Sequence, residues 1–475
     1  MRLKYRVIFV AFLGTILAIL WQELNLSYLE KSHPYKTEHG IIRTADDASY
    51  VQPPMNLKNR GVWKDNSIGN SSFYQRPPGY GAIYLVSSYI YPSNPYVVVK
   101  IIQIVGFFLS IVLVFSLLTQ FGLNQKWVFA ATAVYALLPN FSGFIYHSIT
   151  EGITPTLLLW SVYEWTKLLQ ENQGNPQTLS FRCFLSNVFL LLVRPQLIVF
   201  VIVFMSYLLL KRNIKLAALS LLIFVPFTLW QLRVMSISGS MGMHPIYSYT
   251  NHSFYRPPHE ALGGLFKVWE YKSDRFHETA GLLHVDTSET ARERALLNIP
   301  EKYRRELEPI LQEYQEVSLL ELSGILCQNL NEELDEERAF VKHVDILTTK
   351  LAKGNLLDAF LKTPISSAKE LFMNSHLHLT IFQVKFRGAI WMEVLRWSCL
   401  LVVLFGILAL FILFVFKRNV PVLLWLICLS SVITILYLVF VQRLNEERYL
   451  TPLLPLAFIA SIWLIHSLTR RMHKH

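Results

Sequence analysis

The chain has 475 residues, of which 53% are hydrophobic and only 16% are charged, and its formal net charge is +11. Its apolar residues come in long blocks such as Val97 to Leu118 and Leu400 to Phe416, and a helix of about 20 such residues crosses the ~30 Å hydrocarbon core of a bilayer. These blocks exclude an ordinary soluble globular protein. Because much of the basic excess flanks the apolar blocks, where it sets membrane topology, the charge does not indicate a nucleic-acid partner.

The first apolar block, about Val7 to Trp21, follows a basic N-terminus, which predicts a retained first span with the N-terminus in the cytoplasm. A cleavable signal peptide is the alternative, but the run is long for one and no small-x-small cleavage pattern follows it. Further spans are expected at about 97–118, 127–145, 151–169, two short passes within 181–210, 216–235, 395–416, 420–441 and 452–468. Ten helices with both termini cytoplasmic then satisfy the positive-inside rule.

The predicted fold class is an all-α polytopic membrane protein with about ten transmembrane helices and interfacial helices. Residues 1–235 are expected to form an N-terminal transmembrane module with a first loop over 22–95 on the outer face of the membrane, and residues 392–475 to hold the last helices. Between them, residues 236–391 form a mostly helical periplasmic segment, in which Asn298-Ile299-Pro300 predicts a break between two helices. The stretch Gly81 to Tyr91 is too short to span and predicts an interfacial helix, and 355–372 predicts an amphipathic helix leading back to the membrane.

The four cysteines show no metal-binding spacing, and three of them fall in predicted spans. Cys327 is the one cysteine in the hydrophilic segment, so that segment cannot hold an internal disulfide. The sequence therefore gives no sign of a metal site built from cysteines, and nothing in it demands a cofactor. Adjacent acidic residues could still recruit a divalent cation.

The first loop carries two adjacent acids, Asp46 and Asp47, followed by Lys58, Arg60 and Arg76. A carboxylate at the bilayer surface can act as a general base on an acceptor hydroxyl, and the simpler alternative is a helix cap. Arginine presents a planar fork of donors that suits phosphate, and the simpler alternative is headgroup binding or solvation. Pro77-Pro78 fixes the chain directly after Arg76, which favours a positioned arginine.

Other charged residues are expected on the same face of the bundle. Glu151 begins the fourth span, where an acid that stabilises the helix dipole is the simpler interpretation. Arg194 lies within an apolar block, where an arginine is costly unless it faces a cavity or a partner. The turn before the last span adds Glu446, Arg448 and Tyr449. This convergence of acids and arginines at one face predicts a functional site.

The order of these features resembles the bacterial members of the dolichyl-phosphate-mannose–protein mannosyltransferase-like superfamily, which has the GT-C fold and includes the aminoarabinose transferase of lipid A modification. The resemblance covers the membrane portion nearly end to end. Its motifs are Asp46 with Tyr50 four residues on, Arg76-Pro77-Pro78-Gly79-Tyr80, Thr150-Glu151, Arg194-Pro195 and Arg448-Tyr449-Leu450-Thr451-Pro452. Two departures are that Gln52-Pro53-Pro54-Met55 should interrupt the helix that the family has after the tyrosine, and that residues 236–389 match nothing known.

The resemblance implies an inverting glycosyltransferase of the bacterial inner membrane, with a periplasmic active site, a polyprenyl-phosphate-linked sugar as donor and a hydroxyl on a lipid, glycan or protein as acceptor. Asp46 would be the general base, with Asp47 as the second candidate, and the donor phosphate would meet Arg76, Lys58, Arg60 and Arg194. The remaining expected site residues are Tyr50, Tyr80, Glu151, Glu446, Arg448 and Tyr449. The alternatives are a flippase or transporter of lipid-linked glycan, which needs polar residues through several spans, and a non-catalytic membrane scaffold.

Overall fold

A computed structural model describes most of the chain. The described residues are 2–32, 37–44, 46–64, 76–171, 180–238, 248–250, 253–255, 257–269, 279–280, 282–283, 286, 288–326, 334–374, 390–416, 420–442 and 447–472. Within these ranges the fold is helical apart from one short hairpin, so the predicted all-α class is confirmed.

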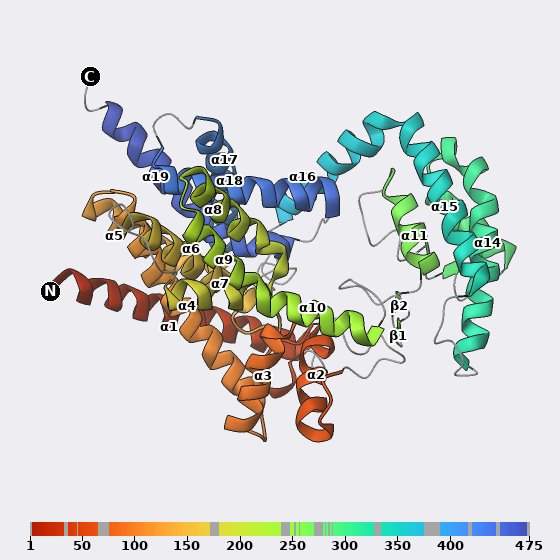
Figure 1. The fold of residues 1–475 in the computed structure, drawn as a ribbon, viewed down its shortest axis with the longest axis horizontal. Helices are drawn as coiled ribbons and strands as arrows, with labels where there is room; N and C mark the ends of the chain where they lie inside the picture. The colour runs from red at the N-terminus through yellow and green to blue at the C-terminus, as the bar shows by residue number, and fades with distance from the viewer. Residues whose placement is uncertain are drawn as a thin grey trace.

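The N-terminal half forms a bundle with two shorter helices on its outside. Its α-helices are α1 (Arg2–Ser32), α2 (Asp47–Arg60), α3 (Pro78–Ile90), α4 (Pro95–Gln120), α5 (Gln125–Leu137), α6 (Thr154–Glu171), α7 (Phe181–Val193), α8 (Ile198–Leu210), α9 (Ile214–Ser220) and α10 (Val225–Ser238). Short 3-10 helices are η2 (Glu38–Gly40), η4 (Pro139–Phe141), η5 (Thr150–Gly152), η6 (Pro195–Leu197) and η7 (Leu221–Phe224). Figure 1 shows α2 and α3 projecting from the lower edge of the bundle.

The C-terminal half contains a second helical group, whose core residues run from Leu262 to Ala359, and the chain then returns to the bundle. The strands β1 (Ser248–Thr250) and β2 (Ser253–Tyr255) pair antiparallel, with Ser248 opposite Tyr255. The helices that follow are α11 (Pro257–Phe266), α13 (Glu289–Leu297), α14 (Glu301–Leu326), α15 (Asp335–Gly354), the π-helix η8 (Asp358–Lys362), α16 (Thr363–Asn374), α17 (Ile390–Val415), α18 (Val422–Leu436), the π-helix η12 (Tyr437–Gln442), the 3-10 helix η13 (Glu447–Leu453) and α19 (Leu454–Met472). The break predicted at Asn298–Pro300 is confirmed between α13 and α14.

The chain is a multi-pass membrane protein. Six helices among the described residues are long and apolar enough to span a bilayer: Tyr5–Lys31, Pro95–Gln120, Ile214–Ser236, Ile390–Val415, Val422–Gln442 and Arg448–Arg470. Two shorter apolar helices, Phe181–Val193 and Pro195–Leu210, form the interrupted pair that was predicted around Arg194. Both chain ends lie on the left of Figure 1, and the second helical group lies at the opposite end of the bundle.

Small residues let the membrane helices approach closely. A Cβ added to Gly14 of α1 would lie 2.5 Å from the Cβ of Ala136 in α5, and one added to Gly406 of α17 would lie 3.1 Å from Ala457 in α19. Helix pairs in lipid lack a hydrophobic driving force between them, so close backbone approach supplies the dispersion contacts that hold them together. The first contact joins α1 to α5 and the second joins α17 to α19, so each holds together two helices of the same half of the bundle.

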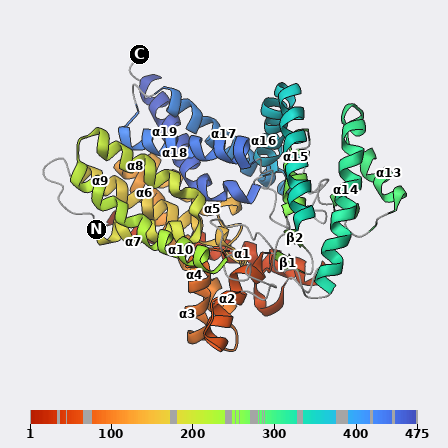
Figure 2. The ribbon, with the colours of Figure 1, turned by 45° about the vertical axis from the view of Figure 1, so that its right-hand side comes forward.

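Two separate hydrophobic cores support the structure. One runs through the bundle, from Ala11 to Leu464, and includes Leu371 of α16. The other lies within the second helical group, and its largest members include Tyr314 and Phe340. Figure 2 shows α13, α14 and α15 set apart from the bundle, with α16 between α15 and α17. The segment that was predicted to return to the membrane therefore connects the two cores.

Two local expectations are wrong. The third span, expected over 127–145, stops as a helix at Leu137, because the chain turns into η4 at Pro139 and then runs irregularly to His147. The interruption expected at Pro53-Pro54 does not occur, since α2 continues through both prolines to Arg60. Each proline removes one backbone donor from the helix, yet both prolines are buried and packing holds the helix together.

Candidate active site

A short parallel bridge positions the loop that carries the two aspartates. The Ile42 amide donates to the Tyr146 carbonyl at 2.7 Å, and the Ser148 amide donates to the Ile42 carbonyl at 3.0 Å. The irregular segment after α5 is held in turn by Gln103 of α4, whose side-chain amide donates to the carbonyls of Ile145 and His147. These bonds satisfy buried backbone groups that no helix serves. They bring the start of α2 beside the Ser148–Gly152 region.

Asp47 is fully enclosed by donors. Its side chain is 1% exposed. Arg43 Nε donates to one carboxylate oxygen at 2.9 Å, the Tyr96 hydroxyl donates to the same oxygen at 3.0 Å, and the Ser148 hydroxyl donates to the other oxygen. A buried carboxylate satisfied in this way is stabilised as a structural anion. Asp47 therefore fastens the loop to α4 and to the 142–149 segment.

Asp46 has a different environment, although it is the next residue. Its side chain makes no capping bond to α2 and stays 25% exposed. Arg76 Nη2 donates to Oδ1 at 2.8 Å, and Arg448 Nη1 donates to Oδ2 at 2.6 Å. Burial raises the pKa of Asp46, but Arg76, Arg448 and, more weakly, Arg194 outweigh it and leave the pKa below its ordinary value. Asp46 is thus an accessible carboxylate that stays ionised at neutral pH.

Tight packing of α3 places Arg76. A Cβ added to Gly79 would lie 2.6 Å from the Leu192 carbonyl carbon, so the first turn of α3 rests directly on the end of α7. Arg76, just before Pro77, also donates from Nε to the Ser49 hydroxyl at 3.2 Å and lies 5.1 Å from the Tyr50 ring centre. Two bonds and a cation–π contact fix the guanidinium. The double proline and the glycine therefore bring Arg76 next to the α7–α8 junction.

A buried ion pair lies behind Asp46. Arg194, at the break between α7 and α8, donates from Nη1 to Glu151 Oε1 at 2.7 Å and to the Thr150 hydroxyl at 2.9 Å. The side chains of Arg194 and Glu151 are 9% and 3% exposed. The other terminal nitrogen of Arg194, Nη2, is buried and makes no hydrogen bond within the described part of the protein. The site thus contains a buried guanidinium with one remaining donor group.

Tyr449 links two of the arginines. Its ring lies 5.0 Å from the Arg194 guanidinium carbon and 5.3 Å from that of Arg448. Arg448 and Tyr449 lie in η13, whereas Arg194 lies at the α7–α8 junction, and these two segments are far apart in the sequence. A ring between two guanidiniums offers a favourable face to each cation and separates their charges. Arg76, Arg194 and Arg448 thus converge around Asp46 and Glu151.

Some predicted residues do not join this cluster. Lys58 donates to the Ser88 carbonyl at 2.5 Å and lies over the Tyr89 ring, and Arg60 is exposed at the end of α2. With a rise of 1.5 Å per residue, both side chains lie about 18–21 Å along α2 from Asp46, the residue that precedes its first turn. Tyr80 is fully buried and packs edge-on against Tyr50. Glu446 lies outside the described residues.

Three contributing residues were not predicted from the sequence: Arg43, Ser49 and Ser148. Thr150 was predicted only as part of the Thr150-Glu151 motif, and its bond to Arg194 was not. Each is a common polar residue whose partner is set by the fold. Ser148 stands three residues before Glu151 in the sequence, which is the one local signal that could have drawn attention to it.

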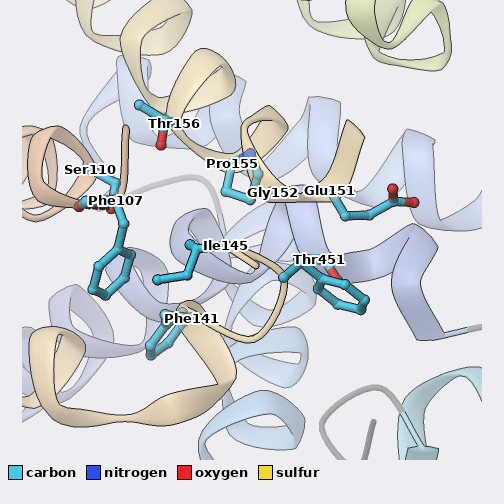
Figure 3. A pocket seen from close by; sticks show the side chains of 10 residues that line it. Phe107, Ser110, Phe141, Ile145, Glu151, Gly152, Pro155, Thr156 and Thr451 are labelled. Carbon is cyan, nitrogen blue, oxygen red and sulfur yellow. Dashed lines mark hydrogen bonds between the residues drawn. The ribbon is translucent and has the colours of Figure 1, made fainter. Parts of the chain in front are cut away.

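A small cavity lies on the inner side of Glu151. It measures about 10 Å³ and is lined by Phe107, Ser110, Phe141, Phe144, Ile145, Glu151, Gly152, Pro155, Thr156 and Thr451. In Figure 3 the Glu151 carboxylate extends away from Phe107 and Thr156. This volume fits roughly one water molecule and excludes a sugar.

Within the described ranges, no group of three or more His, Cys, Asp or Glu side chains is placed to hold a metal ion. The positive charge around Asp46 in this part of the chain comes from guanidinium groups, which suit phosphate because they donate in a fixed planar geometry.

The chain was compared with known proteins. No family model and no curated protein matches it. Among solved structures, it is similar to the crystal structure of ArnT from Cupriavidus metallidurans bound to undecaprenyl phosphate, at 11% identity and a TM-score of 0.34, covering 97% of this chain and 77% of that one. At this level of likeness, a functional assignment depends on the site itself.

Proposed function

We propose that this protein is a membrane glycosyltransferase that moves a sugar from a polyprenyl-phosphate donor to an acceptor hydroxyl. The observation that carries the proposal is the position of Asp46. A partly exposed carboxylate is held between the guanidiniums of Arg76 and Arg448, at the end of the bundle where the second helical group attaches. Such a transfer needs a base that lies next to cations able to bind phosphate.

Each charged residue has a proposed role. Asp46 accepts the proton of the acceptor hydroxyl. Arg76 and Arg448 bind the donor phosphate and stabilise the charge that it gains as it leaves. Arg194 contributes the buried Nη2 group, which has no other partner in the described part of the chain, while Glu151 holds the Arg194 guanidinium in place at 2.7 Å.

The proposed reaction is a single inverting displacement. The acceptor oxygen attacks the anomeric carbon and forms the new glycosidic bond as the bond from that carbon to the phosphate oxygen breaks. Polyprenyl phosphate leaves with that bond's electron pair, and the acceptor proton moves to Asp46. Three guanidiniums supply positive charge for the leaving group, so a divalent cation is not required by this scheme, although the acids could recruit one.

Donor binding should rearrange the ion pairs. In this structure Asp46 neutralises part of the charge on Arg76 and Arg448. A donor phosphate competes for the same guanidiniums, because each N–H can serve one short charge-assisted bond. As phosphate takes over those donors, the Asp46 carboxylate becomes free to accept a proton. The Asp46 carboxylate, which binds Arg76 and Arg448 in the absence of donor, would thus become the base that faces the acceptor hydroxyl.

The proposed location is the bacterial inner membrane, with the site on the periplasmic side. Basic clusters such as Lys211-Arg212 and Arg470-Arg471 favour a cytoplasmic position for the opposite end of the bundle. A polyprenyl tail would then reach the arginines from the outer leaflet. Residues outside these motifs would determine which sugar and which acceptor the enzyme uses.

The test is turnover by purified full-length protein in nanodiscs. The protein is given a panel of undecaprenyl-phosphate sugars with acceptor lipid A, and release of undecaprenyl phosphate is measured. We expect release with one donor and its loss in Asp46→Asn. The matched control is Asp47→Asn, which removes the adjacent structural acid and should retain turnover in its folded fraction.

Two outcomes would count against the enzyme. If Asp46→Asn releases as much undecaprenyl phosphate as the wild type, Asp46 is not the base. If no donor in the panel binds the folded protein, measured by thermal stabilisation, the glycosyltransferase proposal fails. Transport of intact donor across a liposome membrane, without release of phosphate, would instead identify a flippase.

A further inference from the structure

The segment that joins the two cores has an exposed apolar face. Leu357, Leu361 and Ile365 follow one another at four-residue spacing across η8 and α16, and their side chains are 66%, 46% and 53% exposed. Leu356 beside them is 58% exposed. Residues four apart share a helix face, so these side chains form a continuous apolar stripe. Exposed patches of this kind mark surfaces that contact a partner.

The opposite face of the same segment is already used. Ala359 lies in the core of the second helical group, and Leu371 lies in the core of the bundle. The Thr363 hydroxyl donates to the Val268 carbonyl at 3.3 Å. Since 359, 363 and 371 repeat at multiples of four residues, one face of the helix is fixed against protein. The stripe of Leu357, Leu361 and Ile365 must therefore face outward.

The height of this stripe relative to the bilayer follows from its neighbours. α16 contacts α17, the π-helix η12 that follows α18, and η13 before α19, and Figure 2 shows it beside α17. Trp391 and Trp397 at the start of α17 are 58% and 51% exposed. Tryptophans at the end of a membrane helix mark the interface between headgroups and acyl chains. The stripe thus lies at the level where the membrane surface meets the bundle.

We infer that the occupant of this face is the lipid bilayer, and that η8 and α16 form an interfacial helix that docks the second helical group onto the membrane. α17, which α16 contacts, also carries exposed apolar residues, such as Leu401 at 62% exposure. Exposed Lys353 and Lys369 flank the stripe on either side, and lysines beside an apolar helix face are attracted to anionic headgroups.

A functional consequence comes from the contact between α16 and η13. η13 carries Arg448 and Tyr449, so the membrane-docked helix supports the segment that supplies one of the phosphate-binding arginines. The second helical group is thereby held beside the site and at the bilayer surface, where a lipid-borne acceptor would arrive. Movement of α16 away from the bilayer would be transmitted to Arg448.

The experiment measures membrane depth in the full-length protein. The four native cysteines are replaced by serine or alanine, and an environment-sensitive fluorophore is attached at Leu361→Cys. The protein is reconstituted into vesicles of phosphatidylethanolamine and phosphatidylglycerol, with or without a nitroxide-labelled lipid. The same label at Ile346→Cys is the aqueous control, because Ile346 on α15 is equally apolar and 61% exposed. Leu408→Cys, 53% exposed on α17, is the control within the bilayer.

At Leu361→Cys we expect a blue-shifted emission, strong quenching by the lipid nitroxide and protection from iodide, as at Leu408→Cys. At Ile346→Cys we expect the reverse. A label at Leu361→Cys that iodide quenches as at Ile346→Cys would overturn the inference. Protection from both quenchers would also overturn it, because protein would then cover the stripe. Ile365→Cys, read in the same way, guards against a local effect of one substitution.

Discussion

Asp46 and Asp47 are neighbours in the chain but serve different purposes, because their partners differ. Asp47 meets Tyr96 and Ser148 in a buried setting, whereas Asp46 meets two guanidiniums and remains partly exposed. The sequence offered both as candidate bases and favoured Asp46 through the spacing to Tyr50. The structure shows a physical difference between them: Asp47 is 1% exposed and accepts three hydrogen bonds from the protein, whereas Asp46 is 25% exposed.

The arginines around Asp46 make a prediction about pH. Burial raises the pKa of Asp46, but Arg76 and Arg448 lower it by more. The carboxylate of Asp46, the proposed base, is therefore ionised at neutral pH, and activity should be lost only as the pH falls through this lowered pKa. In Arg448→Gln one cation is gone, and the acid limb of the kcat/KM profile should move to higher pH. This profile reports the free enzyme. Arg396→Gln, whose partner is Glu393 at the start of α17, should leave the limb in place, and an unmoved limb in Arg448→Gln would contradict the assignment.

The buried pair of Arg194 and Glu151 makes a prediction about stability. Arg194→Met leaves Glu151 as an unpaired charge with 3% exposure, and breaking a buried ion pair costs roughly 3–5 kcal/mol. The double variant Arg194→Met/Glu151→Gln removes both charges and should recover part of that loss. Reversible unfolding by SDS in mixed micelles would measure both. Equal destabilisation of the single and double variants would show that packing, and not the charge, sets the cost.

At the scale of elements, the sequence predicted what proline and charge determine locally. The break at Arg194-Pro195 and the one at Asn298–Pro300 are both present. The end of α5 at Leu137 was missed although Pro139 follows it, because Phe141, Phe144 and Ile145 keep the mean hydropathy high and hydropathy alone cannot separate a helix from a buried irregular segment. That segment is stable because Gln103 and Gln22 bond its carbonyls. Such bonds between distant residues, like Ser148 with Asp47, leave no periodic signal in the sequence.

The contact between α3 and α7 can be tested through its glycine. In Gly79→Ala the new Cβ would lie 2.6 Å from the Leu192 backbone, which cannot move without shifting α7. We expect α3 to be displaced and Arg76 with it, and a shift of about 1 Å in a positioned group can cost on the order of 10²-fold in rate. Undecaprenyl phosphate release measures the effect. Gly264→Ala in α11 is the control, because nothing lies within 4 Å of its added Cβ. Similar turnover in the two variants would show that Arg76 does not depend on this contact.

At the scale of the whole molecule, one ion pair joins the two ends of the chain. Arg448 and Asp46 are 402 residues apart, and the second helical group lies between them in sequence. The site is therefore completed only when the last spans have packed against the first, through contacts such as those of α19 with α4 and α5 and of η13 with α6. The second helical group has a core of its own and can vary in stability without removing these contacts.

This separation makes a prediction about local unfolding. Phe340 is fully buried in the second core and packs on Tyr314 at 5.8 Å between ring centres, and Phe→Ala in a core costs about 3–5 kcal/mol. In Phe340→Ala, hydrogen exchange of the full-length protein in nanodiscs should accelerate in α11, α14 and α15 and stay unchanged in α4 and α6. Val341→Ala, on the outer face of α15, is the control. Acceleration in α4 as well would mean that the two cores unfold as one unit, so that changes in the second helical group would reach Asp46 and the arginines directly.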